Sequence, residues 1–368
     1  MAEKRVMSSK ALSGLTKALA LAAALIAPMV SLAAGRWNAS PNYHLVKSVP
    51  LGTPNTWDYL VYSPMSNRVF VAHGNRLTVI DGGSGRIVGQ VGPIPGGPHG
   101  IAFDRAANLG ITDDGGIGQA VIFNLQSLKV VKRLKVQRGA DAVAFDPLSG
   151  HAFVIDGRTG DVAVIDPARE RVVTFIHLGG DLEYAVAGRS GELYVNGVTH
   201  HEIFRINTAT NHVDAVLPMP QCRHPHGLAI DTSTHRLFSS CQNQRLVVMD
   251  SKSGKVIATL RIGRGTDADR FDPKNGLIFS SNGVDGTLTI IREVNADTFV
   301  RVSTVRTWPS ARTMAIDPES GRVFLVAART KSPQAWRAAY TAFMAGRQSK
   351  GSPFVPNSTH LLFFDPGH

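Results

Sequence analysis

Cysteine is scarce in this chain, with only Cys222 and Cys241 among 368 residues. No Cys-x-x-Cys-His motif is present, so covalent attachment of a c-type haem is excluded. The two cysteines flank one expected β-hairpin, and in an oxidising compartment we expect a disulfide that fixes the loop carrying His224 and His226. The alternative is a soft metal site with Cys222, His224 and Cys241 as ligands.

Long apolar runs are missing beyond the N-terminal segment. Residues 1–34 combine a basic start, the apolar run Ala18–Ala27 and small residues at the end, which is the pattern of a secretory signal peptide. The run is shorter than the roughly 20 residues that a membrane-spanning anchor needs. We therefore expect cleavage after Ala33 or Ala34. The mature protein, residues 35–368, is expected to be a single domain without a transmembrane segment, in the periplasm or secreted.

Dense basic runs and common catalytic motifs are also absent. The formal net charge is +11, but Lys and Arg are scattered, which favours solubility over sequence-specific nucleic-acid binding. The run His200–Glu202 lacks the second His of a zinc-protease helix, and Gly82–Gly85 lacks the strand–helix context of a nucleophilic serine. We expect a monomer whose partner is a small polar ligand or another exported protein.

The chain does contain one phrase that returns seven times, built around an Asp-Pro or similar turn. The anchor positions lie 41 to 45 residues apart: Ser63, Asp104, Asp146, Gly188, Asp231, Asp272 and Asp317. Short β-branched segments bounded by turn residues separate them. A repeat of this length predicts four strands per copy, and seven copies predict an all-β, seven-bladed propeller.

The last repeat differs from the others at both of its ends. The sequence stops just after its expected third strand, Leu361–Asp365, whereas Tyr43–Leu51 has the pattern of a fourth strand. We expect this N-terminal strand to complete blade seven and close the ring. Residues 329–358 are an insertion, in which Ser332-Pro333 predicts the start of a short helix ending near Gly346. The insertion is either a functional lid or decoration.

Ionisable residues recur at one position in every repeat. Strand directions place the entries to the innermost strands and the loops between second and third strands on one face, here called the top face, and put the insertion over the channel mouth. Five residues before the anchors, at the start of the innermost strands, stand Asp58, His99, Asp141, Glu183, His226, Asp267 and Arg312. Ten residues after four of the anchors stand His73, Asp114, Asp156 and Asn282.

These positions predict a top-face site for a polar ligand or a divalent metal ion, because imidazole and carboxylate groups are common metal ligands. The candidate metal ligands are His99, His226, Asp141, Glu183 and Asp267. The alternative is that the polar groups bind loop amides between blades. Trp57 is either a wall of the ligand site or a plug between blades.

Several segments resemble the YVTN-repeat propellers, the YncE-like exported bacterial proteins. The segments that carry the resemblance are Pro225–Asp231, Arg236–Phe238, Ser280–Gly283 and Ala311–Asp317. The likeness extends from about Tyr43 to Asp365 and implies an exported seven-bladed propeller, usually without an assigned reaction. Relatives with similar blades include lactonases, streptogramin lyases and quinoprotein or haem domains.

Three functions are consistent with these observations. The first is a ligand-binding or accessory protein that uses the top-face funnel. The second is a lactonase-like, metal-dependent hydrolase or lyase that uses the His and carboxylate groups there; no catalytic residue is assigned. The third is a scaffold for a protein or a polyanion.

Overall fold

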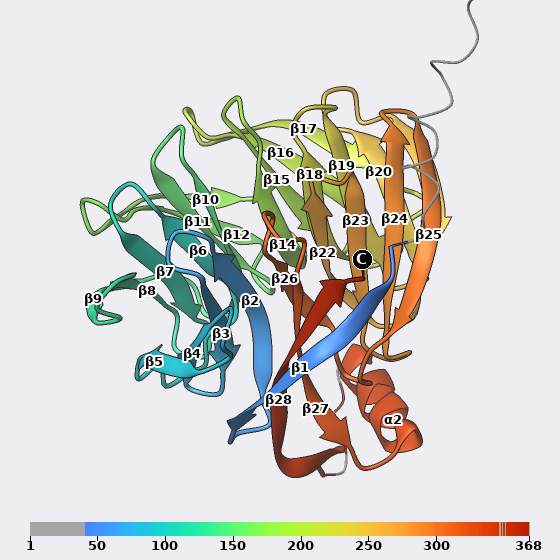
Figure 1. Cartoon of the computed structure of the whole chain (residues 1–368). Coiled ribbons are helices and arrows are strands. Elements are labelled where there is room, and N and C mark those ends of the chain that lie inside the picture. Colours follow the sequence, from blue (N-terminus) through green and yellow to red (C-terminus); the bar gives the residue numbers. More distant parts are fainter. Residues whose placement is uncertain (1–40, 346, 348, 350, 368) are drawn as a thin grey trace, which may run out of the picture. The chain divides into compact units, whose positions relative to one another are not determined.

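The computed structural model describes residues 41–345, 347, 349 and 351–367. The expected signal peptide and the expected helix end at Gly346 lie outside the described residues. Within them, the chain forms seven four-stranded antiparallel sheets arranged as blades around a ring (Figure 1). The predicted seven-bladed β-propeller is confirmed.

The blades follow one another along the chain, and each is written here from its innermost to its outermost strand. Blade one consists of β2 (Trp57–Ser63), β3 (Arg68–His73), β4 (Arg76–Asp81) and β5 (Ile87–Val91), and blade two of β6 (Ile101–Asp104), β7 (Leu109–Asp114), β8 (Gln119–Asn124) and β9 (Val130–Lys135). Blade three consists of β10 (Ala140–Asp146), β11 (His151–Asp156), β12 (Asp161–Asp166) and β13 (Arg171–His177), and blade four of β14 (Leu182–Ala187), β15 (Glu192–Gly197), β16 (Glu202–Asn207) and β17 (His212–Pro218). Blade five consists of β18 (Pro225–Asp231), β19 (Arg236–Cys241), β20 (Arg245–Asp250) and β21 (Val256–Arg261), and blade six of β22 (Thr266–Asp272), β23 (Leu277–Asn282), β24 (Thr287–Asn295) and β25 (Thr298–Arg306). Blade seven consists of β26 (Thr313–Ile316), β27 (Val323–Thr330), β28 (Phe354–Pro366) and β1 (Tyr43–Gly52).

Apolar packing between blades holds the ring together. The two middle strands of each blade consist largely of buried residues. The buried apolar side chains form one cluster in each of the seven gaps between neighbouring blades. The innermost strands contact their neighbours around the ring, including β2 with β26. The innermost strands are therefore held close to one another, which brings together the residues at the starts of these strands.

The N-terminal strand completes the last blade, as predicted. Strand β1 pairs antiparallel with β28, from Tyr43 opposite Pro366 to Gly52 opposite Thr359, and Figure 1 shows them side by side. The Tyr43 hydroxyl donates to the Gly321 carbonyl at 3.0 Å, and its ring packs edge-on against Phe279 of blade six. Residues from both ends of the described chain thus stabilise one sheet.

The insertion in blade seven contains the predicted helix, α2 (Pro333–Met344). Ser332 is the N-cap, because its side chain accepts the Ala335 amide at 3.0 Å, and Pro333 occupies the first helical turn. The Trp336 side chain is buried and its Nε1 donates to the Gly283 carbonyl at 2.8 Å. This bond attaches the helix to the neighbouring blade six. Within the described part of the chain, no helix is long and apolar enough to cross a bilayer.

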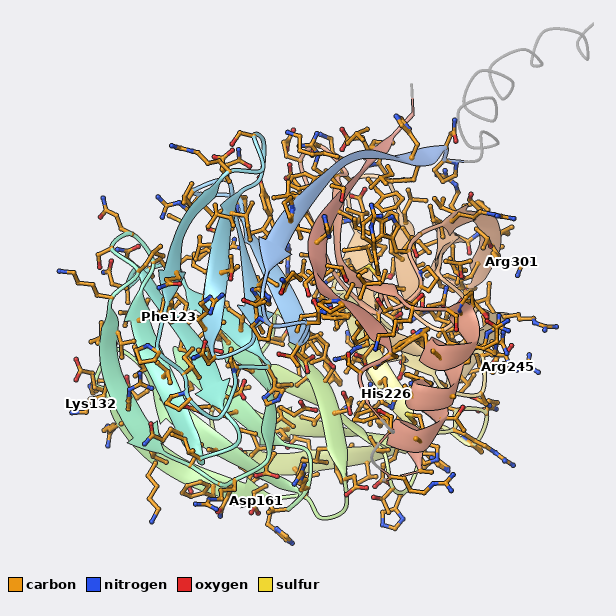
Figure 2. All side chains as sticks on the ribbon, turned by 90° about the horizontal axis from the view of Figure 1, so that it is seen from below. Phe123, Lys132, Asp161, His226, Arg245 and Arg301 are labelled. Atoms are coloured by element: carbon orange, nitrogen blue, oxygen red, sulfur yellow. A yellow bond between two sulfur atoms is a disulfide. The ribbon has the colours of Figure 1, made fainter. Side chains whose placement is uncertain are left out.

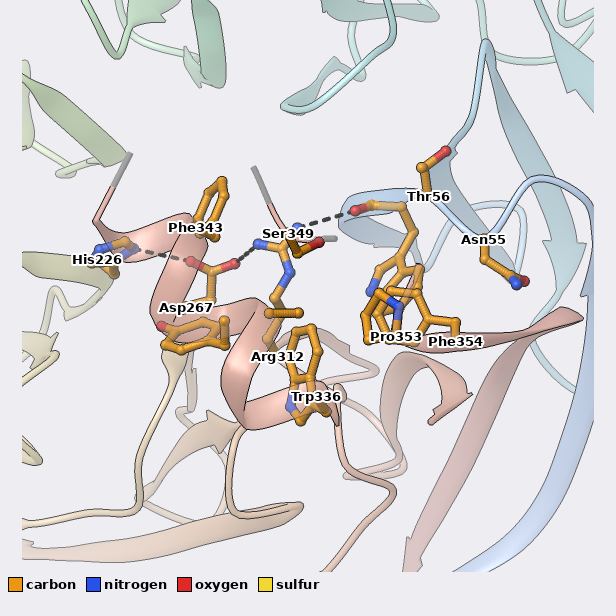
Figure 3. Close-up of a pocket in the computed structure, with 13 residues that line it drawn as sticks. Asn55, Thr56, His226, Asp267, Arg312, Trp336, Phe343, Ser349, Pro353 and Phe354 are labelled. Atoms are coloured by element: carbon orange, nitrogen blue, oxygen red, sulfur yellow. Dashed lines mark hydrogen bonds and ion pairs between the residues drawn. The ribbon is translucent and has the colours of Figure 1, made fainter. Parts of the chain in front are cut away.

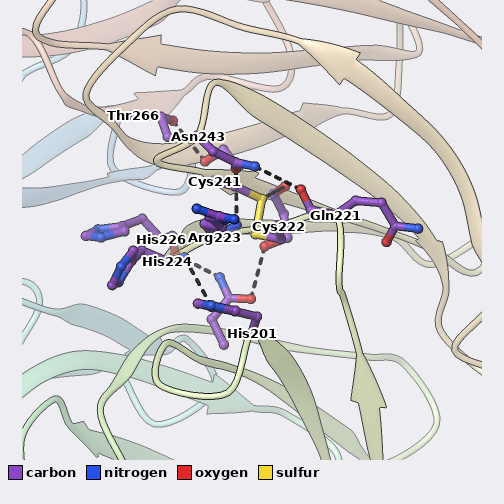
Figure 4. Close-up of a disulfide and its surroundings, with 12 residues drawn as sticks. His201, Gln221, Cys222, Arg223, His224, His226, Cys241, Asn243 and Thr266 are labelled. Atoms are coloured by element: carbon purple, nitrogen blue, oxygen red, sulfur yellow. Dashed lines mark hydrogen bonds between the residues drawn. A yellow bond between two sulfur atoms is a disulfide. The ribbon is translucent and has the colours of Figure 1, made fainter.

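The two cysteines form the expected disulfide. Cys222 in the loop before β18 is bonded to Cys241 at the end of β19, with the Cα atoms 5.3 Å apart (Figure 4). Both side chains are fully buried. The alternative soft metal site is wrong, because both sulfur atoms are used in the bond. The loop fixed by the disulfide carries His224 and leads into His226.

Candidate functional site

The seven ionisable residues of the innermost strands meet at the centre of the propeller, and together they are called the ionisable ring: Asp58, His99, Asp141, Glu183, His226, Asp267 and Arg312. Five of them are the second residue of their strand, and the other two lie one or two residues before theirs. Figure 2 shows His226 beside α2, whereas Lys132 and Arg301 lie on the outer strands β9 and β25.

Asp267 and Arg312 join four members of the ring. His226 Nδ1 lies 3.0 Å from Asp267 Oδ1, and Arg312 Nη1 donates to Asp267 Oδ2. The other end of the guanidinium, Nη2, donates to the Trp57 carbonyl at 3.1 Å and lies 3.5 Å from Asp58 Oδ2. Figure 3 shows His226, Asp267 and Arg312 in this row. Both oxygens of Asp267 are therefore paired with cationic side chains.

Glu183 lies near the same ring nitrogen of His226 as Asp267 does. Its Oε1 accepts the Tyr59 hydroxyl at 3.0 Å and is 3.7 Å from His226 Nδ1. Tyr59 is fully buried and packs against Tyr184 with ring centroids 4.9 Å apart. The carboxylate is thus held in a fixed position by a group that sequence reasoning did not identify.

The ring contains two groups with metal-ligating chemistry, here called the first triad (Asp58, His99, Asp141) and the second triad (Glu183, His226, Asp267). In each triad the three ligand atoms lie within 4.8 Å of one another. One imidazole and two carboxylates suit zinc or manganese.

Asp113 positions His99 and was not among the predicted site residues. Its Oδ2 lies 2.8 Å from His99 Nδ1, and its Oδ1 accepts the backbone amides of His99 and Gly100. The side chain is fully buried. This contact leaves Nε2 of His99 as the ring nitrogen available to another group, which is how carboxylates commonly orient metal-ligating histidines.

The surrounding carboxylates favour the protonated form of both histidines. Burial lowers the pKa of His226, but the carboxylates of Glu183 and Asp267 outweigh burial and raise it to about 9. Burial also lowers the pKa of His99, but the hydrogen bond and charge of Asp113 and the charge of Asp58 outweigh it and raise the value to about 10. Both imidazoles are therefore cationic at neutral pH.

The carboxyl groups of the ring differ in their environments. Burial raises the pKa of Asp141 well above its ordinary value, and the charges of Glu183 and Asp58 raise it further. Burial also raises the pKa of Glu183 to about 7 against the opposing charge of His226. For Asp267 the Arg312 and His226 cations outweigh burial and lower the pKa. The ring thus combines Asp267, whose carboxyl group stays ionised, with Glu183, whose carboxyl group can gain or lose a proton near neutral pH.

The four residues of the second predicted set lie at the ends of second strands, and much of their bonding is to backbone. His73 Nε2 contacts the Pro54 carbonyl at 2.8 Å and its Nδ1 contacts a threonine hydroxyl. Asp114 accepts the Gly96 amide, and Asp156 accepts the amides of two residues that follow it. The amide of Asn282 donates to carbonyl and hydroxyl groups of blade six. These bonds fit loop fixation better than ligand binding.

The insertion covers part of the ring and encloses a cavity with it, here called the α2 cavity (Figure 3). Its volume is about 270 Å³. The ring contributes His226, Asp267 and Arg312, and the other walls are Asn55, Thr56, Trp57, Trp336, Ala339, Tyr340, Phe343, Ser349, Pro353 and Phe354. The strand-direction argument placed the insertion over the channel mouth, and the structure agrees. The cavity therefore has an ionised floor and largely aromatic walls.

Trp57 belongs to the cavity wall and also packs between elements, so both interpretations of this residue apply in part. Its ring packs against Phe354 with centroids 5.2 Å apart, and Phe354 packs in turn against Trp336 at 5.4 Å. The Tyr340 hydroxyl donates to Gln242 Oε1 at 2.8 Å, which ties α2 to blade five. The aromatic wall is therefore a packed unit attached to two other blades.

Comparison with known proteins supports the fold alone. No family model and no curated protein matches the sequence. Among solved structures, the chain is similar to a chain of hydrazine synthase from Kuenenia stuttgartiensis, with a TM-score of 0.66 and 14% sequence identity over 75% of this chain and 94% of that chain. A propeller fold hosts many unrelated functions, so the function of this chain must be argued from its site.

Proposed function

We propose that this chain is an exported protein of the YVTN-repeat type that binds a small ligand in the α2 cavity. One observation carries the proposal: the insertion of blade seven and three members of the ionisable ring share one cavity. A concave site with apolar walls and a few convergent polar groups is the usual form of a small-molecule site. The Cys222–Cys241 disulfide supports export, because such bonds persist in oxidising compartments.

Two neighbouring alanines of α2 provide a matched test. Ala339 lines the cavity, whereas Ala338 is exposed and is not a cavity wall. Ala339→Trp should fill the cavity, and Ala338→Trp should add the same side chain outside it. Protein purified from the periplasm would be incubated with the periplasmic small-molecule fraction, and retained compounds identified by native mass spectrometry.

We expect the same compound on the wild type and on the Ala338→Trp variant, and its loss from Ala339→Trp. A compound that stays bound to Ala339→Trp would place the ligand elsewhere. Retention of no compound by the wild type would favour the scaffold function instead, in which case binding to exported proteins or polyanions should respond to salt.

A metal-dependent hydrolase or lyase is the second candidate, because both triads bring one imidazole and two carboxylates together. The His99–Asp113 contact supports the first triad in particular. Elemental analysis of protein purified without chelator, beside the His99→Ala/His226→Ala variant, tests it. A near-stoichiometric metal that is lost in the variant would support a metal site. The absence of metal from both proteins would contradict this candidate and leave the ligand-binding proposal in place.

A further inference from the structure

The hydrogen-bonding groups of the α2 cavity indicate the chemical class of its ligand, and this inference rests on the ligand-binding function proposed above. We propose that the cavity binds an amphipathic organic acid. Its carboxylate lies against the donors of Trp57, His226 and Arg312, and its apolar body lies against the aromatic side chains of the insertion.

The ring part of the cavity offers donors and no free acceptor. Asp267 is the one carboxylate among the described cavity walls, and its two oxygens are already paired with His226 Nδ1 and Arg312 Nη1. Among the described residues, Nε2 of His226 and Nε of Arg312 have no hydrogen-bond partner. The carboxyl groups of Asp58 and Glu183 also lie against these two cations but are not cavity walls, so the free hydrogen-bonding groups at this end of the cavity are donors, which favours an acceptor such as a carboxylate.

Trp57 provides an independent donor. It is 8% exposed, lines the cavity, and its indole Nε1 is buried without an acceptor in the part of the chain that the structure describes. A buried donor without a partner is costly, so a ligand oxygen that accepts this N–H would relieve the cost. The Trp57 carbonyl accepts Arg312 Nη2, so the backbone of Trp57 lies against the guanidinium.

The opposite walls present apolar surface. Trp336 Nε1 is bonded to the Gly283 carbonyl, and the Tyr340 hydroxyl is bonded to Gln242, so both polar atoms are already paired with protein groups. Phe343 and Phe354 add two more rings. An aryl or alkyl body is therefore the complement to these walls, whereas a sugar or another highly hydroxylated body would lose hydrogen bonds to water there.

The test compares four probes that share one body and differ in the head group: 3-phenylpropanoate, 3-phenylpropanamide, 3-phenylpropanol and 3-phenylpropylamine. Their dissociation constants would be measured by calorimetry with the wild-type protein at pH 7 and low salt. We expect the carboxylate to bind at least about tenfold more tightly than the alcohol or the amine, the size of one charge-assisted hydrogen bond.

Two variants assign the preference to its groups. Trp57→Phe keeps a ring and removes the N–H donor, so it should weaken the carboxylate about tenfold and the alcohol less, because the bond to a charged acceptor is the stronger one. Trp308→Phe is the matched control, since Trp308 packs on His360 and is not among the cavity walls. Phe343→Ala, at a side chain that is 68% exposed, should weaken all four probes alike.

The results test the chemical class of the ligand and the location of its binding site separately. Equal binding of carboxylate and alcohol, or tighter binding of the amine, would overturn the acid preference, and continued sensitivity to Phe343→Ala would keep the cavity as the binding site. If none of the four probes binds the wild-type protein, both this inference and the ligand-binding function are contradicted for apolar-bodied ligands. The head-group comparison uses the wild-type chain and does not depend on how a variant folds.

Discussion

His226 Nδ1 lies 3.0 Å from Asp267 Oδ1, and this ion pair joins blade five to blade six at the centre of the propeller. The two residues occupy equivalent positions of consecutive repeats, one in β18 and one in β22. The side chains are 12% and 9% exposed, so solvent screens the pair only weakly. The pair is therefore part of the site and part of the inter-blade contact at once.

The pH dependence of stability follows from His226. Its pKa is about 9 in the folded protein against an ordinary 6.5, so between these values the folded state holds more protons than the unfolded state. The stabilisation is complete below pH 6.5 and is lost as the pH rises through 9. The free energy of unfolding should therefore fall from pH 7 to 9. His226→Gln should flatten this slope by on the order of 1 kcal/mol per pH unit.

Glu183 acts in the same direction at lower pH. Its pKa is about 7 against an ordinary 4.5, so rising pH between these values also favours the unfolded state. Urea unfolding at a series of pH values measures both contributions. Equal slopes from pH 7 to 9 for the wild type and His226→Gln would contradict the role given to the imidazole.

Removal of the Arg312 guanidinium should destabilise the fold strongly. Arg312→Met keeps much of the side-chain volume but removes the cation between Asp58 and Asp267 and leaves Asp267 with His226 alone, and breaking a buried pair in this way costs about 3–5 kcal/mol. The control is Arg169→Met, whose side chain is 74% exposed and pairs with Asp166 three residues earlier in the chain. That change should leave the free energy of unfolding almost unchanged, because solvent screens an exposed pair. Similar losses in the two variants would show that Arg312 is not a structural cation.

The disulfide should contribute about 3 kcal/mol, the value for a closed loop of this length, with Cys222 and Cys241 separated by 19 positions. The Cys222→Ala/Cys241→Ala variant should lose this amount in urea unfolding. Both sulfur atoms are buried, so reductant should leave the folded wild type unchanged and lower its unfolding midpoint to that of the variant. An unfolding midpoint insensitive to reductant would argue against the bond.

Strand β1 should be essential for the whole fold. Removal of residues 41–51 would expose β28 along its outer edge and remove the Tyr43 contacts to blades six and seven. We expect loss of the cooperative thermal transition, measured by circular dichroism. A chain that begins at Pro41 is the control and should keep the transition. Retention of a native-like transition by the shorter chain would mean that blade seven is stable with three strands.

The repeat predicted the fold and the position of the ring for one physical reason. Equivalent positions in seven equal blades must lie at the same height and radius, so counting five residues back from each anchor was enough to find Asp58, Glu183 and the other ring members. The same logic found the insertion over the channel, because strand direction alternates along each blade. The second set followed the count too, but its members bond within the protein: Asp114 and Asp156 accept backbone amides, whereas His73 and Asn282 contact carbonyl and hydroxyl groups.

The residues that sequence reasoning missed have no repeat equivalence. Asp113 precedes the counted residue Asp114, and on a strand the two side chains point to opposite faces, so Asp113 reaches His99 while Asp114 binds the Gly96 amide. Tyr59 and Tyr340 owe their places to tertiary packing of one blade and of the insertion. Alternation along β7 was the available signal for Asp113. For Tyr340 the sequence offers no comparable signal.

The pairing of β1 with β28 also imposes an order in time. For a chain made from its N-terminus, β1 emerges first, and its partner follows about 300 residues later, which is roughly 15–60 s at common rates of synthesis. Until then, β1 has no strand to pair with, and the insertion before β28 has no completed blade to anchor it. The α2 cavity is therefore the last part of the molecule to form, and a chain interrupted before β28 is expected to lack it.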